Sequence, residues 1–326
     1  MNKHQVNITL QDIIQAHKRI QAYIYHTPLE YSEKISILYD SNIYLKLENL
    51  QVTGSFKPRG ALNRLLTLDD TERKRGVIAP SAGNHGIGLA YAAKRLNVPA
   101  YVYLPKDADA SKICSLERYG ALIKFFDSIE EARLSALKDA KEDGYTFLSA
   151  YNDPSVIAAD GTVALEILDD LPDVDTVLIC MGGGGLTAGM CIALKSVNPN
   201  IQVWGIQTEN SPTLAVWHRT GKITDVDIKP SIAEGLSGPI EPETISFPII
   251  QNHIDRIITV TEEELIDAMK IMLDSQFIVE PSGVAGIAAL KRYSKELNGR
   301  KVAVVVTGRN ISWLRLISLV KYFALR

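Results

Sequence analysis

One stretch decides how this chain is interpreted: Glu48-Asn49-Leu50-Gln51-Val52-Thr53-Gly54-Ser55-Phe56-Lys57-Pro58-Arg59-Gly60. Lys57 stands there between an aromatic residue and a proline, just before a predicted helix over 61–68. A helix N-terminus carries partial positive charge, and an apolar ring disfavours a charged neighbour. Both features should lower the pKa of the Lys57 amine, and a neutral amine is what a Schiff-base lysine needs. The simpler alternative is a solvated surface lysine, and the flanking residues weigh against it.

A second motif is a row of four glycines, Gly182 to Gly185, between a predicted strand over 174–180 and a predicted helix. Glycine lets a loop turn its N–H groups inward, and with a helix N-terminus these groups form an anion site suited to a phosphate. A dinucleotide site is the alternative, because Gly183-x-Gly185-x-x-Ala188 fits that fingerprint and Glu209 follows the next predicted strand. Such a match is weak on its own, and it predicts a nicotinamide oxidoreductase.

Two further motifs follow predicted strands. Ser81-Ala82-Gly83-Asn84-His85-Gly86 follows a strand over 76–79, and Val306-Thr307-Gly308-Arg309-Asn310 lies at the end of an apolar strand over 301–306. Parallel sheets bind ligands at the carboxyl ends of their strands, which is where Thr307 stands. Asn84 is close to a helix start, so a helix-capping role is the alternative to ligand binding. From residue 76 onward strands alternate with helices, which predicts parallel α/β sheets.

Together the four motifs closely resemble those of the serine/threonine dehydratases, which belong to the fold-type II pyridoxal-phosphate (PLP) enzymes. The resemblance covers residues 9–318. It implies an α/β fold similar to the tryptophan synthase β chain, with two open parallel-sheet domains and the cofactor between them. It also implies a discontinuous large PLP-binding domain, residues 1–49 and 150–326, and a small domain, residues 50–149.

The resemblance also implies the roles of individual residues. Lys57 would carry PLP as an imine and act as the catalytic base. The cofactor-binding residues would be Phe56, Lys57, Asn84, Gly182, Gly183, Gly184, Gly185 and Thr307. The substrate-binding residues would be Ser81, Ala82, Gly83, Asn84 and His85, with no metal ligand among them. The pattern favours a structural role for His85 over a general base. Arg309 departs from the family, which more commonly has a second glycine there, and this leaves the substrate open.

The implied reaction is α,β-elimination, which turns L-threonine into 2-oxobutanoate, or L-serine into pyruvate, and releases ammonia. The alternatives are elimination from another substrate such as a hydroxyaspartate, an aryl-serine or a diamino acid, serine racemisation, and a non-catalytic PLP-binding protein. Ala82 argues against racemisation, because similar racemases have a proton-donating serine there. Gln207 and Thr213 fall where those racemases have two metal-binding carboxylates, and neutral side chains bind Mg²⁺ or Ca²⁺ poorly.

Composition excludes several classes of protein. The 326 residues carry 35 basic and 38 acidic side chains, so there is no basic excess to hold a nucleic acid. No apolar run reaches the roughly 18 residues of a membrane span, and Met1 to Leu10 lacks the core of a signal peptide. We therefore expect a cytoplasmic enzyme with a small amino-acid substrate. The resemblance implies a homodimer or homotetramer and no C-terminal regulatory domain.

Overall fold

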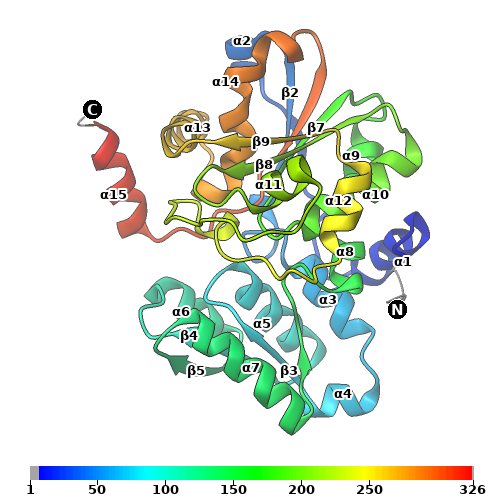
Figure 1. Cartoon of the computed structure of the whole chain (residues 1–326), viewed down its shortest axis with the longest axis vertical. Helices are drawn as coiled ribbons and strands as arrows, with labels where there is room; N and C mark the ends of the chain where they lie inside the picture. The colour runs from blue at the N-terminus through cyan, green and yellow to red at the C-terminus, as the bar shows by residue number, and fades with distance from the viewer. Residues whose placement is uncertain (1–6, 325–326) are drawn as a thin grey trace.

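The computed structural model describes residues 7–324 and arranges their strands in two sheets, which occupy separate halves of the molecule (Figure 1). The larger sheet has the strand order β1-β2-β10-β7-β8-β9, and the smaller sheet has the order β5-β4-β3-β6. All neighbouring strands in both sheets are parallel except β1 and β2, which are antiparallel. The predicted α/β class with two parallel sheets is confirmed, and the antiparallel edge strand was not predicted.

The strands of the larger sheet are β1 (Leu29–Tyr31), β2 (Asn42–Lys46), β7 (Thr176–Cys180), β8 (Gln202–Thr208), β9 (Arg256–Val260) and β10 (Lys301–Val305). Those of the smaller sheet are β3 (Val77–Pro80), β4 (Ala100–Pro105), β5 (Leu122–Phe126) and β6 (Thr146–Phe147).

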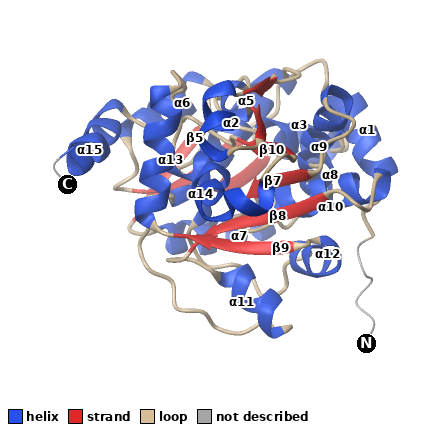
Figure 2. Ribbon diagram, turned by 90° about the horizontal axis from the view of Figure 1, so that it is seen from above, coloured by secondary structure: helices blue, strands red, loops and turns tan. Residues whose placement is uncertain are grey.

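Helices cover both faces of the larger sheet (Figure 2). Successive strand residues point to opposite faces, so Leu178 packs with α13 (Glu262–Asp274) and α14 (Ala285–Leu297). Its neighbour Val177 belongs to the cluster on the other face, together with residues of the helices α9 (Thr162–Asp170) and α10 (Gly185–Val197). Coverage on both faces explains why β7 reads as an apolar run rather than as an alternating pattern.

The smaller sheet is packed in the same way. One face contacts α7 (Ile129–Asp143), and the other contacts α5 (Asn84–Leu96) and α6 (Ala110–Arg118). The two halves share an apolar cluster in which α3 (Pro58–Leu66) packs against α5 of its own half and against α1 (Leu10–Ile20) and α8 (Pro154–Asp160). The remaining helices are α2 (Glu33–Tyr39), α4 (Asp70–Arg75), α11 (Thr213–Thr220), α12 (Ser246–His253) and α15 (Trp313–Ala324).

In the sequence, Thr9 followed by Asp12 predicts a helix start, and α1 begins there. The Asp12 amide donates to Thr9 Oγ1 over 3.3 Å and Thr9 N donates to the Asp12 carboxylate over 2.8 Å, which makes a capping box. The alternation of strands and helices in the sequence predicts one helix over 155–170, but the chain forms two helices, α8 and α9, with a break at Gly161. A side chain at Gly161 has no room: its Cβ would lie 2.7 Å from the carbonyl oxygen of Gly189.

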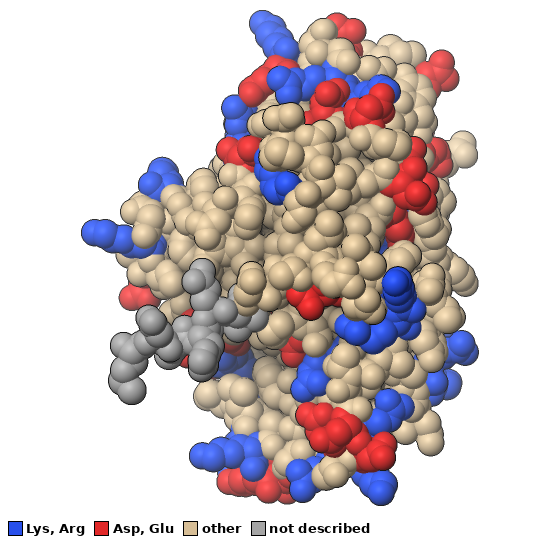
Figure 3. Space-filling view, turned by 90° about the vertical axis from the view of Figure 1, so that its right-hand side faces the viewer, with Lys and Arg blue, Asp and Glu red and all other residues tan. Residues whose placement is uncertain are grey.

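Within residues 7–324, none of the helices is long and apolar enough to cross a membrane. On the face shown in Figure 3, basic and acidic side chains are interspersed rather than gathered into a stripe of one sign. This distribution agrees with the small net charge of the sequence, −3.

Candidate active site

A cavity of about 630 Å³ lies where loops of the two halves meet. The loops that follow β3, β7 and β10 all open onto it, as expected for the carboxyl ends of parallel strands. Every residue predicted to hold the cofactor or the substrate lines it: Phe56, Lys57, Ser81, Ala82, Gly83, Asn84, His85, Gly182, Gly183, Gly184, Gly185 and Thr307. The fold thus brings four motifs from distant parts of the sequence to one site.

Lys57 lies on the cavity wall, directly before α3. Its Nζ donates to the carbonyl oxygen of Ala150 over 3.0 Å and lies 4.7 Å from the centre of the Phe56 ring. Burial lowers the pKa of the Lys57 amine, and the nearby Asp160 carboxylate opposes that shift. The direction agrees with the sequence prediction, but the dominant cause is burial by the surrounding protein, not the helix terminus.

The glycine loop is closely surrounded by other residues. Gly184 has a φ of +88°, which glycine adopts freely. A Cβ at Gly183 would lie 2.4 Å from a ring carbon of Tyr151, and the Gly183 carbonyl accepts a hydrogen bond from Ser246 Oγ over 2.7 Å. In the first turn of α10, the buried hydroxyl of Thr187 has no hydrogen-bond partner. This cradle, with its unused hydroxyl and helix N-terminus, fits a phosphate group.

Asn84 takes part in a network that joins the two halves. It is the first residue of α5 and makes no capping bond, so the capping alternative is wrong. Instead Asn84 Nδ2 donates to Glu280 Oε1 over 2.5 Å, and Asn84 Oδ1 accepts from Asn310 Nδ2 over 2.6 Å. Burial raises the pKa of Glu280 to about 7. The sequence analysis missed Glu280, although a glutamate between Val279 and Pro281 in an apolar segment is a usable signal.

The loop after β3 presents donors to the cavity. Ser81 Oγ accepts hydrogen bonds from the amides of Gly83 (3.3 Å) and Gly86 (3.1 Å), so its own hydrogen remains available. His85 Nε2 lies 3.0 Å from the carbonyl oxygen of Leu148. Burial, helped by the charge of Lys57, lowers the pKa of His85 to about 4, so the imidazole is neutral and donates to that carbonyl. Its fixed position suits a structural histidine.

Thr307, Arg309 and two basic residues at the rim of the cavity occupy different surroundings. Thr307 is buried beyond the end of β10 and lines the cavity. Arg309 is exposed and does not line it, so the departure from the family pattern does not reach the site. Two basic side chains lie at the rim of the cavity: Lys112, which forms an ion pair with Glu234 over 2.9 Å, and Arg315.

The two positions compared with a racemase metal site, Gln207 and Thr213, are both buried. Gln207 Oε1 accepts from the amide of Ala215 over 2.8 Å, and the hydroxyl of Thr213 has no partner. Neither side chain supplies a carboxylate. Among the described residues, a histidine and two carboxylates do gather at ligand spacing in His26, Asp169 and Asp170, but all are exposed and outside the cavity.

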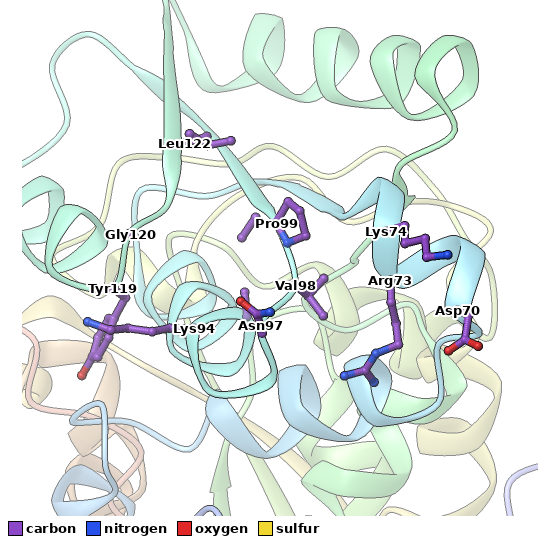
Figure 4. A pocket seen from close by; sticks show the side chains of 12 residues that line it. Asp70, Arg73, Lys74, Lys94, Asn97, Val98, Pro99, Tyr119, Gly120 and Leu122 are labelled. Atoms are coloured by element: carbon purple, nitrogen blue, oxygen red, sulfur yellow. The ribbon is translucent and has the colours of Figure 1, made fainter.

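A second, more open hollow of about 720 Å³ lies around the start of β4 (Figure 4). Its cations contact nearby backbone: Arg73 donates to the carbonyl oxygen of Leu96 over 3.1 Å, and Lys94 donates to that of Arg118 over 2.9 Å. None of the residues predicted to hold cofactor or substrate lines this hollow. The chemistry predicted from the motifs therefore belongs to the cavity at Lys57.

Comparison with known proteins agrees with this site. The family described as pyridoxal-phosphate dependent enzyme matches residues 20–308. The chain is 41% identical to the L-threonine ammonia-lyase of Thermotoga maritima, over 93% of this chain and 76% of that protein. It is 35% identical to an L-threo-3-hydroxyaspartate ammonia-lyase of a Pseudomonas species, over 95% and 98%. Maize serine racemase superposes with a TM-score of 0.90 at 31% identity, covering 97% of this chain and 98% of that one.

The residues at the site fit PLP. A lysine with a lowered pKa faces the cavity, and the glycine cradle with the free Thr187 hydroxyl suits the phosphate of the cofactor. The alternative of a nicotinamide oxidoreductase is not supported. It was inferred from Gly183 and Gly185, which belong to this phosphate cradle, and the matching family is that of pyridoxal-phosphate dependent enzymes. The chain belongs to the pyridoxal-phosphate dependent enzymes of fold-type II and, among them, to the serine/threonine dehydratase family of lyases.

Proposed function

We propose that the enzyme eliminates water from L-threonine, and from L-serine, and releases ammonia together with 2-oxobutanoate or pyruvate. The observation that carries the proposal is a single cavity holding a lysine of lowered pKa, a glycine cradle and the Ser81–Gly86 loop. The 41% identity to a protein named threonine ammonia-lyase supports the substrate.

We assign the cofactor contacts as follows. Lys57 Nζ would hold PLP covalently, and Phe56 would lie beside the ring. The amides of Gly182, Gly183, Gly184 and Gly185, with the Thr187 hydroxyl, hold the phosphate, and Asn84 donates to the phenolic oxygen. Thr307 would be the residue at the pyridine nitrogen. A neutral hydroxyl there stabilises positive charge on that nitrogen less than a carboxylate does, which favours elimination over chemistry that needs a long-lived carbanion.

The substrate contacts follow from the same loop. The Ser81 hydroxyl and the amides from Ala82 to His85 bind the substrate carboxylate. PLP, when bound, supplies an electron sink that makes the Cα–H bond of the substrate acidic. Lys57 Nζ, once the substrate amine has displaced it, would remove the Cα proton. The β-hydroxyl would leave as water, taking up one proton that balances the proton removed by Lys57, and the released enamine would react with one water to give the 2-oxo acid and ammonia.

We also propose the wider organisation implied by the family. The large domain comprises residues 1–49 and 150–326 and the small domain residues 50–149, which is supported by the confinement of β3 to β6 to residues 77–147. The enzyme acts as a homodimer or homotetramer in the cytoplasm. The amino-acid substrate is its small-molecule partner.

A second candidate substrate is L-threo-3-hydroxyaspartate. Arg315 brings a cation to the cavity rim, where a second carboxylate could bind, and one relative is named for this substrate. Racemisation is less well supported, since Ala82 has no proton to donate and Gln207 and Thr213 supply no carboxylate.

The test is a substrate panel on purified enzyme loaded with PLP. We expect 2-oxo acid and ammonia from L-threonine and L-serine, with no D-isomer in the remaining amino acid. Turnover of 3-hydroxyaspartate alone would favour the second candidate. A D-isomer without 2-oxo acid would contradict elimination and the argument from Ala82.

The cradle can be tested at its tightest point. In Gly183→Ala the new methyl group would lie 2.4 Å from a Tyr151 ring carbon, so the loop must shift. Overpacking of this kind costs about 1–3 kcal/mol, and we expect PLP affinity to fall about tenfold or more. Titration of the apoenzyme with PLP, followed by visible absorbance, measures it. Adding Tyr151→Ala should restore part of the affinity, and unchanged binding in Gly183→Ala would contradict the assignment.

A further inference from the structure

Asp160 is a buried acid that the reaction described above does not use. It is the last residue of α8 and packs against α3: a Cβ built on Gly60 would lie 3.3 Å from Asp160 Oδ1. Only 1% of its surface is exposed, and neither carboxyl oxygen has a hydrogen-bond partner. A buried carboxylate without a partner is costly, so its charge must be compensated or neutralised.

The neighbouring buried charges are already balanced among themselves. Arg59 forms hydrogen bonds of 2.6–2.9 Å with both Glu48 and Glu166, and Lys46 Nζ lies 2.7 Å from Glu166. These four side chains are at most 2% exposed, and their two positive charges match their two negative charges. Asp160 is therefore an additional acid beside a neutral cluster.

The remaining group of opposite charge is Lys57. The charged groups that act on Asp160 are Lys57 and Arg59 at the start of α3 and Glu48 in the preceding turn. Lys57 lies three residues before Gly60, the position of α3 that contacts Asp160, and its own Cβ lies beside Gly88 of α5. The buried acid thus has no hydrogen-bond partner, while the nearby Lys57 amine donates to the uncharged carbonyl oxygen of Ala150.

We propose that Asp160 is the buried counter-charge of Lys57, and that the two side chains share one proton. The amine holds the proton while the carboxylate is ionised, and the carboxyl group holds it while the amine is neutral, so the net charge of the pair stays the same. Asp160 is then a positioning residue for charge that acts through Lys57, and the inference rests on the proposed role of Lys57 as base. Burial raises the pKa of Asp160 to about 7 and lowers that of Lys57, as expected for two groups that titrate together.

The direct test measures the amine in the full-length apoenzyme. Reductive methylation with formaldehyde and cyanoborohydride, quantified for the Lys57 peptide by mass spectrometry across pH, reports the fraction of neutral amine. An ionised Asp160 stabilises the protonated amine, so Asp160→Asn should lower the pKa of Lys57. For the wild type we expect the fraction of labelled Lys57 to rise over a broad pH range. For Asp160→Asn we expect a single-proton titration curve. Its midpoint should be lower by about one pH unit or more, which is a tenfold change in proton concentration. The matched control is Asp169→Asn, an exposed aspartate on the adjacent α9, which should leave the curve unchanged.

A second measurement covers the case in which Asp160→Asn folds poorly. In Lys57→Met the acid loses its counter-charge, so its folded pKa lies still further above the unfolded value of about 3.9. Stability from a raised carboxyl pKa is present at low pH and is lost as pH rises through the folded pKa. Denaturant unfolding between pH 5 and pH 9 should therefore show a loss of stability in Lys57→Met that is absent from Lys57→Met/Asp160→Asn.

The two proposals fail separately. Identical labelling curves for wild type and Asp160→Asn, or parallel stability profiles for Lys57→Met and Lys57→Met/Asp160→Asn, would overturn the shared proton even if threonine is turned over. If Asp160→Asn shifts the labelling curve but the wild-type enzyme turns over no member of the substrate panel, the shared proton would be supported and the proposed function would be contradicted.

Discussion

Lys57→Ala is expected to lose at least about 10⁴-fold of the turnover number, which is the upper range for the loss of one acid–base group. The variant loses both the covalent attachment of PLP and the base that removes the Cα proton. We expect it also to lose the visible absorbance of the imine and the bleaching of that absorbance by borohydride. Release of 2-oxo acid from L-threonine, measured beside the absorption spectrum, tests both.

The control for this variant is Lys106→Ala. Lys106 is an exposed lysine paired with Asp127 on the surface of the same half, and its loss should change neither spectrum nor rate. Wild-type turnover in Lys57→Ala would refute the mechanism. Loss of turnover with an intact imine spectrum would mean that another lysine carries the cofactor.

Arg59→Met is expected to cost about 3–5 kcal/mol of unfolding free energy, because removing one member of a buried ion cluster leaves the others uncompensated. Burial alone would lower the pKa of Arg59, but Glu48 and Glu166 outweigh it and raise that pKa, so the guanidinium is charged at every working pH. Methionine fills the volume but supplies no donor to either carboxylate. Denaturant unfolding of the apoenzyme at neutral pH measures the loss.

Arg64→Met is the matched control, five residues further along α3. Arg64 is partly exposed, and its nitrogens lie 3.3 Å from Asp153 and 3.5 Å from Glu72. Such pairs contribute about 0–1 kcal/mol, so this variant should stay close to wild type. If both variants lost equally little, the buried cluster would not stabilise the fold as its geometry indicates.

Much of the site could be predicted because each motif combines a local backbone demand with a chemical group. Each of three motifs indicates a turn between a strand and a helix: the row of glycines, the lysine before Pro58 and the loop after β3. The order of the strands in the sheets brings these turns together, and only the family resemblance implied that they share one site.

What the sequence did not reveal depends on partners far along the chain. Asp160 and Glu280 look like ordinary acids until the fold buries them, one against α3 and the other against Asn84. At Gly161, between α8 and α9, the close approach of Gly189 leaves no room for a side chain, and no local sequence pattern indicates that contact. The short helix α4 was missed for another reason: it has no apolar face, although the capping box of Asp69 with Glu72 marks its start.

The position of β10 has a consequence for synthesis on the ribosome. This strand, residues 301–305, pairs with β2 on one side and with β7 on the other, so the centre of the larger sheet is the last strand to be translated. At roughly 5–20 residues per second, β2 waits on the order of tens of seconds for its parallel partner. Throughout that interval β2 exposes an unpaired edge, and β7 does so from its own synthesis onward, and such edges are sites for aggregation. Nascent chains stalled before residue 301 should therefore engage chaperones, and release of the final segment should end that dependence.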